Sequence, residues 1–214
     1  MLTRTFSKEQ TRKNFSGVAW FYDLWGRFTE YKALNMAINI SGLTNNVNVI
    51  DVGVGTGQLF SRILEINTKG LNSGMDLSLD MINKVNKKFK NTDRKIILAE
   101  GNAYNLPYKD EQFDFLFSSY MMDLLPEKDF RFLLSEFNRV MKPGATGLII
   151  SMSMGNHWYN RIWFLTAKYF PSLLTECRPV QLSGYLADVK FNITEQKVIS
   201  QNTFPSEIIK FYKF

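Results

Sequence analysis

A cluster of three glycines is the feature of this sequence best suited to hold a small ligand. Gly53, Gly55 and Gly57 follow the β-branched run 47–52 and precede apolar residues at helical spacing. Glycine lets the backbone turn sharply and approach a ligand closely, and a helix that starts here offers free N–H groups to that ligand. The cluster therefore predicts a strand, a ligand-binding loop and a helix in succession.

The spacing of the glycines bears on the type of ligand. A dinucleotide-binding loop has the spacing G-x-G-x-x-G, whereas this loop has G-x-G-x-G and carries Gln58 at the position of the third dinucleotide glycine. NAD is therefore the weaker interpretation. An oxidoreductase that uses a nicotinamide nucleotide stays open as an alternative.

Two carboxylates and a further loop extend the predicted site. Asp51 comes just before the glycines, and Asp76 ends the second predicted strand, where a carboxylate can accept hydrogen bonds from both hydroxyls of a ribose. The segment Gly101-Asn102-Ala103 follows the third predicted strand, and Ser118 and Ser119 end the fourth. Ligands of open α/β sheets bind beyond the carboxyl ends of the strands, so we expect these loops to form one site.

The elements that must position these residues alternate along the chain. Strands are predicted at 47–52, 71–75, 95–99, 113–118 and 146–152, with helical patterns between them. Two more strand-like segments, 191–200 and 207–214, favour an antiparallel hairpin. We expect an α/β fold with a doubly wound, Rossmann-like sheet of about seven strands, mostly parallel, with a C-terminal antiparallel hairpin and helices on both faces.

The 214 residues fit one domain, because no repeat, linker or composition break divides them. Within this domain we distinguish four parts by their patterns. They are an N-terminal helical cap at 1–45 with two predicted helices, a cofactor-binding core at 46–152, substrate-cover helices at 153–190 and the terminal hairpin at 191–214.

Taken in order, these motifs resemble those of the class I S-adenosylmethionine (SAM) dependent methyltransferases over nearly the whole chain. The run Asp51–Gly57 is similar to the first motif of that family, Asp76 to its ribose-binding acid, and Val140–Gly144 to its turn into the fifth strand. The resemblance implies SAM as cofactor and S-adenosylhomocysteine as product. The cofactor-binding residues that it implies are Asp51, Gly53, Val54, Gly55, Thr56, Gly57, Asp76, Leu77, Met81, Gly101, Asn102, Ala103, Ser118 and Ser119.

The resemblance also implies roles for some of these residues. Asp51 would hold the ammonium group of SAM directly or through water, the glycines would border its methionine part, and Leu77 and Met81 would line its adenosine. Asn102 departs from the family, which usually has Asp there to accept a hydrogen bond from the adenine amino group. An amide oxygen can still accept such a bond, but without charge.

The two ends of the chain resemble particular subfamilies of these methyltransferases. The run 15–23 is similar to the entry motif F-x-x-V-A-x-x-Y-D of the ubiquinone/menaquinone C-methyltransferases, and the last three residues, Tyr-Lys-Phe, also resemble theirs. The glycine loop is similar to that of bacterial phosphatidylethanolamine N-methyltransferases as well. After the fourth strand the chain has Ser-Tyr-Met-Met-Asp at 119–123, where the quinone enzymes carry an Arg-Asn pair.

Methyl transfer from a sulfonium is an in-line displacement, so the protein must mainly align the reactants and exclude water. A general base is useful when the acceptor must lose a proton. Three residues are candidates for acceptor-side chemistry, each with a structural alternative. Asp123 follows the fourth strand but is equally suited to cap a turn, His157 follows the fifth strand but is a lone histidine, and Tyr22 is either a hydrogen-bond donor or a packed aromatic.

An aromatic segment at 155–174 carries two tryptophans and several tyrosines and phenylalanines beside Arg161 and Lys168. It lies between the fifth strand and the hairpin, where this fold usually inserts a substrate cover. Three interpretations stay open: a wall of an apolar acceptor site, a contact with a membrane surface, and simple packing onto the sheet. The acceptor that we expect is a small, apolar or amphiphilic molecule such as a quinone precursor, a lipid or an aromatic metabolite.

Composition excludes several classes of protein. A single cysteine and a single histidine argue against a disulfide framework and against a multi-Cys/His metal site, so we expect no metal. The net charge of +6 is modest, and no N/D-P-P-Y/F motif follows the fourth strand, so we expect no nucleic-acid partner.

Apolar runs are too short to span a bilayer and the start of the chain is polar, which favours a cytoplasmic protein. A non-catalytic SAM-binding protein is a third hypothesis, and the oligomeric state stays open.

Overall fold

The structure is a computed structural model that describes residues 28–169 and 177–214. A seven-stranded sheet forms its centre, with strands in the order β3-β2-β1-β4-β5-β7-β6. The strands are β1 (Val49–Val52), β2 (Leu71–Asp76), β3 (Lys95–Glu100), β4 (Phe113–Ser119), β5 (Met141–Met152), β6 (Phe191–Gln201) and β7 (Phe204–Lys213). The α-helices are α3 (Tyr31–Ser41), α4 (Gln58–Ile66), α5 (Leu79–Lys88), α6 (Phe130–Val140), α7 (Arg161–Tyr169) and α8 (Ser183–Asp188).

The pairing of the strands confirms the expected mixed sheet. Neighbouring strands from β3 to β5 are parallel, whereas β7 runs antiparallel to both β5 and β6. The sheet is therefore a doubly wound α/β sheet with a C-terminal hairpin. The carboxyl ends of its five parallel strands meet at one edge, as the motif order requires.

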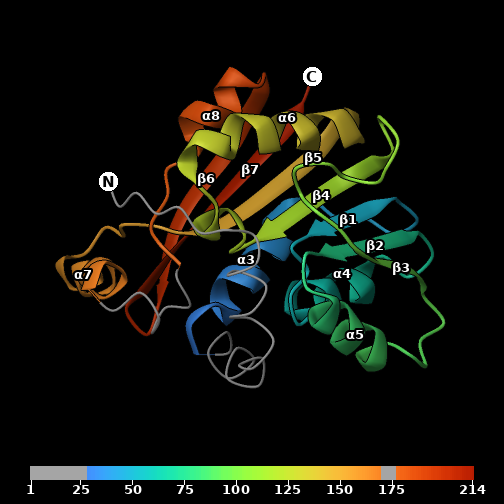
Figure 1. Ribbon diagram of the computed structural model, residues 1–214, viewed down its shortest axis with the longest axis horizontal. Helices are drawn as coiled ribbons and strands as arrows, with labels where there is room; N and C mark the ends of the chain where they lie inside the picture. Colours follow the sequence, from blue (N-terminus) through green and yellow to red (C-terminus); the bar gives the residue numbers. More distant parts are fainter. Residues whose placement is uncertain (1–27, 170–176) are drawn as a thin grey trace.

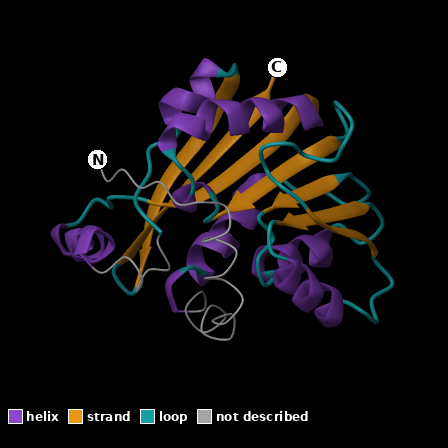
Figure 2. Cartoon of the chain, in the orientation of Figure 1, coloured by secondary structure: helices purple, strands orange, loops and turns teal. Residues whose placement is uncertain are grey.

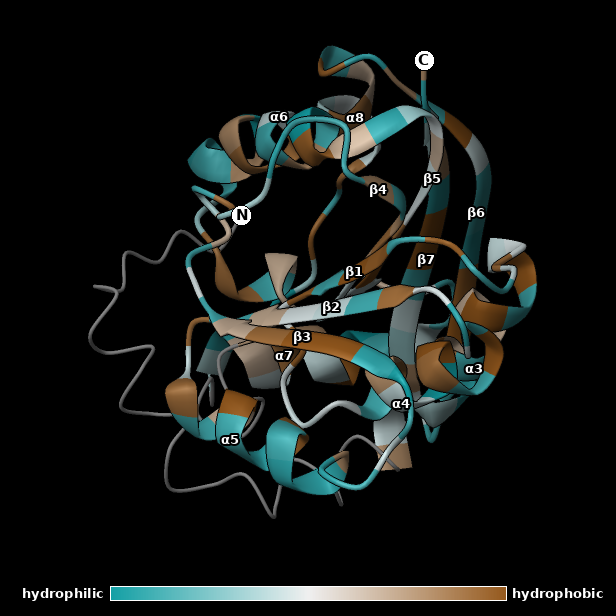
Figure 3. Cartoon of the chain, turned by 90° about the vertical axis from the view of Figure 1, so that its right-hand side faces the viewer, coloured by the Kyte–Doolittle hydropathy of each residue, from teal (hydrophilic) through white to brown (hydrophobic). Residues whose placement is uncertain are grey.

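Helices cover both faces of the sheet (Figures 1 and 2). On one face α6 and α8 pack over a core that includes Ile50, Leu116 and Ile149. On the other face α3 and α4 pack over Phe117 and Leu148, and α5 lies beside α4. Figure 3 shows apolar residues concentrated on the strands and hydrophilic residues along α5. Both layers depend on the alternation of side chains between the two faces of each strand.

Two boundaries differ from those that the sequence predicted. β5 begins at Met141 rather than at 146, because Met141 already pairs with Phe113 and the irregular register near Phe113 absorbs the Lys-Pro-Gly turn, where Gly144 has φ +76°. The hairpin is also tighter than expected, because Pro205 lies inside β7 opposite Ser200. A two-residue turn at 202–203, with φ of 48° and 69°, joins the two strands.

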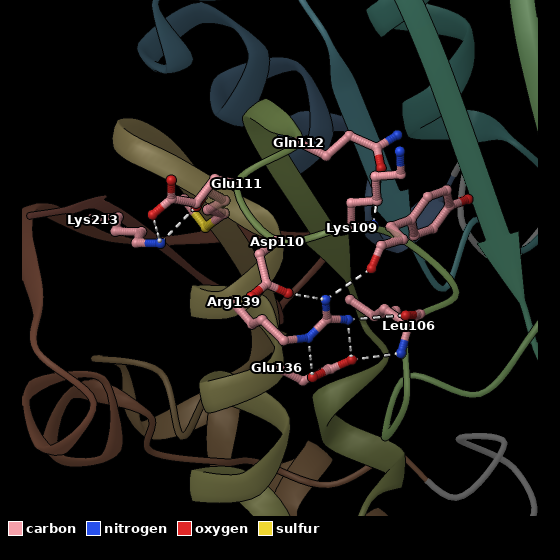
Figure 4. A network of polar contacts seen from close by, with 10 residues as sticks. Leu106, Lys109, Asp110, Glu111, Gln112, Glu136, Arg139 and Lys213 are labelled. Atoms are coloured by element: carbon pink, nitrogen blue, oxygen red, sulfur yellow. Dashed lines mark hydrogen bonds and ion pairs between the residues drawn. The ribbon is translucent and has the colours of Figure 1, made fainter.

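A polar network fixes the loop that leads from β3 to β4 against α6 (Figure 4). The guanidinium of Arg139 donates to Glu136 of the same helix at 2.6 and 2.9 Å, and to the carbonyl oxygens of Leu106 and Tyr108 at 3.0 and 2.8 Å. Glu136 in turn accepts from the Leu106 N–H at 2.7 Å. The network thereby holds the chain that runs from the Gly101-Asn102-Ala103 loop to the start of β4.

The predicted cap at 1–45 lies mostly outside the described residues. Of the two helices expected there, the second corresponds to α3, and the first falls within residues 1–27, which the structure does not describe. In the predicted cover segment, α7 lies beside the turn of the β6–β7 hairpin (Figure 1), whereas α8 packs on α6 and β6. Nothing within the described ranges forms a helix that is both long and apolar enough to cross a membrane.

Candidate functional site

The glycine loop curls over the end of β2. The N–H groups of Gly53 and Val54 both donate to the Met75 carbonyl, at 2.8 and 2.9 Å. Gly53, Gly55 and Gly57 have φ values of +80°, +52° and +75°, which side chains with a Cβ rarely adopt. The sequence expectation that glycine is needed here for backbone conformation is confirmed.

Asp51 lies at the base of this loop with its carboxyl group fully buried. Neither carboxyl oxygen has a hydrogen-bond partner among the described residues. Burial raises the pKa of Asp51 to about 8, and the nearby Asp76 adds to this rise. A buried carboxyl group without a partner costs free energy, so its position calls for a donor or a cation from outside the described fold.

Asp76 joins the loops that follow β1 and β2. One carboxyl oxygen accepts from the Gly55 N–H at 2.9 Å, and the other accepts from the Ser78 N–H at 2.9 Å. Burial raises the pKa of Asp76, and the backbone bonds from Ser78, Gly55 and Leu77 oppose this rise. Ser78 caps α5, as the sequence predicted, by accepting from the Met81 N–H. Each carboxyl oxygen keeps a second lone pair for a further donor.

The loop after β3 comes to the same place. Gly101 donates to the Asp76 carbonyl at 2.9 Å, and a Cβ at Gly101 would lie 2.5 Å from the Met75 sulfur. The side-chain oxygen of Asn102 accepts from the Tyr104 N–H at 3.1 Å, so an adenine amino group would share an oxygen that is already in use. Ala103 packs against the core behind the loop. Three loops thus converge around the ends of β1, β2 and β3.

The segment after β4 closes the other side of this site. Tyr120 has φ +51°, and the next side chain, Met121, lies against the glycine loop, where a Cβ at Gly53 would be 2.9 Å from the Met121 Cβ. Ser118 is fully buried, and its hydroxyl has no partner among the described residues. Ser119, the last residue of β4, is partly exposed. The Met121 side chain therefore packs directly against Gly53, and more polar groups follow it beyond β4.

Those polar groups form an acidic cluster around Asp123. One oxygen of Asp123 accepts from the Met152 N–H at 2.7 Å, and the other is buried without a partner in the described chain. Burial raises the pKa of Asp123 well above its usual range, and the charge of Glu30 raises it further, while Arg178 opposes the rise. Burial also raises the pKa of Glu30 to about 8. The Tyr120 hydroxyl lies 2.7 Å from that of Ser206 and is coupled electrostatically to Glu30 and Asp123.

The other two acceptor-side candidates stand apart from this cluster. His157 is exposed at the start of a short 3-10 helix, where its N–H donates to the Asn160 side-chain oxygen at 3.0 Å and its carbonyl accepts from the Asn160 N–H at 3.0 Å. Its ring stacks on Tyr159 at 4.9 Å. These contacts give it a structural role, and its catalytic role stays a prediction. Tyr22 lies outside the described residues.

Sequence reasoning did not single out Glu30, Tyr120 or Met121 as site residues. Met121 and Tyr120 stand beside Asp123 in the sequence, but only the left-handed backbone at Tyr120 turns Met121 toward Gly53. Glu30 comes from the segment before α3, far from the other motifs in sequence. A residue that comes to the site only through tertiary packing has no sequence motif of its own by which it could be predicted.

A mixed seven-stranded sheet whose carboxyl edge carries a glycine loop and two convergent carboxylates defines a Rossmann-like, cofactor-binding α/β domain of the methyltransferase type. Residues 49–144 match the methyltransferase domain family. Over this central part, from β1 to the start of β5, the chain is similar to the SAM-dependent methyltransferases.

Comparison with individual proteins agrees with this assignment. The chain is 32% identical over 146 residues to the ubiquinone/menaquinone biosynthesis C-methyltransferase of Wigglesworthia glossinidia brevipalpis, covering 65% of this chain and 58% of that protein. It is 28% identical over 155 residues to the demethylmenaquinone methyltransferase of Listeria welshimeri, covering 70% and 65%. The chain thus spans less than two thirds of the length of these relatives. The structure of geranyl diphosphate C-methyltransferase from Streptomyces coelicolor A3(2) has a TM-score of 0.68 at 14% identity, covering 86% of this chain and 78% of that one, and shows the shared fold.

The residues at the site fit SAM, the methyl donor of this family. Asp51 offers a buried carboxylate that has no partner in the described chain, which suits an ammonium group. Asp76 is held by two backbone bonds with lone pairs to spare, which suits a ribose diol. Because the family match extends through the glycine loop, SAM displaces NAD as the expected cofactor.

Proposed function

We propose that this chain transfers a methyl group from SAM to a small apolar or amphiphilic acceptor by in-line displacement, with S-adenosylhomocysteine as product. The observation that carries the proposal is the buried carboxyl group of Asp51, which has no hydrogen-bond partner among the described residues. It lies at the base of the glycine loop, whose Gly55 N–H donates to Asp76. The family match and the names of the relatives support it. When bound, SAM supplies an activated methyl group on a sulfonium centre.

In this proposal the loops after β1, β2 and β3 bind and orient the cofactor. Asp51 pairs with the ammonium group, and the glycine loop with Val54 and Thr56 borders the methionine part. Asp76 accepts from the ribose hydroxyls, while Leu77, Met81 and the loop 101–103 surround the adenosine. Holding two reactants in line is worth roughly 7–11 kcal/mol of the barrier in well-oriented systems, so positioning is the main catalytic contribution expected of these residues.

The segment after β4 takes the acceptor in this proposal. The Met121 side chain, with its thioether, lies against Gly53 of the glycine loop, and Ser118 and Ser119 lie before it on β4. Asp123 and Glu30 serve as proton acceptors or orienting groups for an acceptor that must lose a proton. The pKa of Glu30, raised by burial to about 8, suits this task, because a general base works best when its pKa is near the working pH.

The proposed identity of the acceptor rests on the relatives. The relatives are named for methylation of quinone precursors, and the structural neighbour is named for geranyl diphosphate, all of which have large apolar parts. A quinone precursor, a lipid or an aromatic metabolite is therefore the class that we propose. A cytoplasmic location with contact to a membrane surface is part of the same proposal.

The direct test is transfer of labelled methyl from SAM into a cell extract, followed by partition of the label between organic solvent and water. We expect organic-phase label with the wild-type chain and its loss in Asp76→Ala, because that variant removes the carboxylate that accepts from the ribose. Asp93→Ala, which changes an exposed acid away from the site loops, is the matched control and should keep the activity.

Two results would contradict the proposal in different ways. Label confined to water or to protein would overturn the apolar acceptor while keeping methyl transfer. Binding of SAM without transfer to any fraction would overturn catalysis and favour a non-catalytic SAM-binding protein.

A further inference from the structure

A stripe of large apolar side chains lies exposed along α7 and the short 3-10 helix (Trp158–Asn160) that leads into it. Trp158 is 81% exposed, Ile162 57%, Leu165 48% and Tyr169 63%. Their spacing, i, i+4, i+7 and i+11, places them on one face of a continuous helical segment. Neighbouring exposed apolar side chains of this size mark an interaction surface, unlike single exposed apolar residues.

The opposite side of α7 is fixed to the body of the protein, so the stripe faces outward. Ala167 is buried, the Trp163 indole N–H donates to the Thr203 hydroxyl at 3.0 Å, and the Trp163 ring packs edge-on against Phe204 at 5.3 Å. Asn160 adds a bond to the Thr203 carbonyl at 2.6 Å. These contacts attach the helix to the turn of the β6–β7 hairpin, as Figure 1 also shows.

Positive charge borders the stripe. Arg161 and Lys168 are exposed on one flank of it, and the Lys168 ammonium lies 5.2 Å from the centre of the Tyr169 ring. From Met152 to Thr175 the sequence contains no Asp or Glu. Aromatic and aliphatic side chains flanked by cations, in a stretch of sequence without acids, match the interface of an anionic bilayer, where tryptophan and tyrosine lie at the headgroup level.

We propose that Trp158 and α7 dock on the surface of an anionic lipid bilayer. The stripe enters the boundary between headgroups and acyl chains, and Arg161 and Lys168 lie against headgroup phosphates. This surface follows directly from the end of β5, at the same edge of the sheet as the glycine loop. Resting on the proposed function, docking would bring the methyl-donor site to an acceptor dissolved in the membrane.

The test is sedimentation of the purified chain with vesicles of phosphatidylcholine alone and of phosphatidylcholine mixed with phosphatidylglycerol. Ile162→Ser with Leu165→Ser removes part of the stripe, and we expect it to weaken binding to the mixed vesicles roughly tenfold or more. Arg161→Gln with Lys168→Gln should weaken binding roughly fivefold for each charge removed. Phe132→Ser on α6 is the matched control, because Phe132 is 59% exposed, and it should bind as the wild type does.

Several outcomes would overturn the proposal. Wild-type chain that stays in solution with the mixed vesicles, or stripe variants that bind as tightly as the control, would remove the bilayer as the partner. A stripe variant that converts a dimer to a monomer in light scattering would assign the face to a second copy instead. SAM binding and far-ultraviolet circular dichroism report whether each variant is folded. Vesicle binding needs no methyl transfer, so failure here is distinguishable from failure of the proposed function.

Discussion

At the scale of single residues, Asp51 shows a conflict between binding and stability. Its carboxyl group is buried without a partner in the described chain, and its pKa is raised to about 8. Between the unfolded value near 3.8 and the folded value near 8, the folded chain binds more protons than the unfolded chain. The free energy of unfolding therefore falls as the pH rises through this range. The buried Asp51 carboxyl group therefore lowers the stability of the chain without cofactor at neutral pH.

Replacing this carboxyl group should make the chain without cofactor more stable. We expect Asp51→Asn to raise the free energy of unfolding at pH 7 by roughly 1–3 kcal/mol, because the buried Asp51 carboxyl must take up a proton when the chain folds at this pH, whereas an amide need not. The gain should shrink as the pH falls toward the unfolded value of 3.8 and should vanish well below it, where the wild-type carboxyl is protonated in both states. Urea unfolding followed by circular dichroism at several pH values measures this. A variant less stable than the wild type at pH 7 would show that Asp51 has a structural partner.

At the scale of elements, the Arg139 network holds the β3–β4 connection to α6. The hydrogen bond from Arg139 is the largest cause that lowers the pKa of Glu136. A lowered pKa of a carboxyl group means that its contribution to stability is present above the unfolded value, near 4.5, and is lost as the pH falls through the folded value. The contacts that hold the β3–β4 connection to α6 are therefore strongest when Glu136 is ionised.

We expect Arg139→Met to lower the free energy of unfolding by about 1–3 kcal/mol at pH 7, because it leaves two backbone carbonyls and the carboxylates of Glu136 and Asp110 without their charged donor. The loss should become smaller in acid. The matched control is Arg131→Met on the same helix, whose ion pair with Asp188 is solvent-exposed and worth about 1 kcal/mol or less. Equal losses for the two variants in thermal unfolding would contradict the assigned role of the network.

The elements themselves were largely predictable, because hydrophobic periodicity and glycine spacing are local signals. The strands, the capped start of α5 and the antiparallel hairpin all follow from such signals and are confirmed. The start of β5 was not predictable, since Met141 becomes strand only through its pairing with Phe113. Pro205 was also misplaced, because its position within β7 depends on a two-residue turn without glycine.

At the scale of the whole molecule, the site is an assembly of loop ends that the sheet brings together. The convergence of the candidate cofactor loops could be predicted because each follows a recognisable strand, while their role in binding stays a prediction. Of the acidic cluster after β4 only Asp123 could be singled out from the sequence, since Glu30 comes to it through the packing of the segment before α3. Burial and electrostatic coupling are properties of the assembled molecule, and no single segment of sequence carries them.

The central claim is that the orphaned carboxyl group of Asp51 receives the cationic end of SAM. With a pKa of about 8, Asp51 is mostly protonated at pH 7 in the free chain, and an arriving ammonium group favours the ionised form. Binding should therefore release a proton. Isothermal titration calorimetry of SAM at pH 7, in buffers with different ionisation enthalpies, measures that release together with the affinity.

We expect proton release on binding to the wild-type chain and to the control Asp93→Asn. In Asp51→Asn we expect both the loss of this release and an affinity at least roughly tenfold weaker, as suits the loss of a charge-assisted bond in a buried site. SAM binding by Asp51→Asn with wild-type affinity and the same proton release would contradict the account.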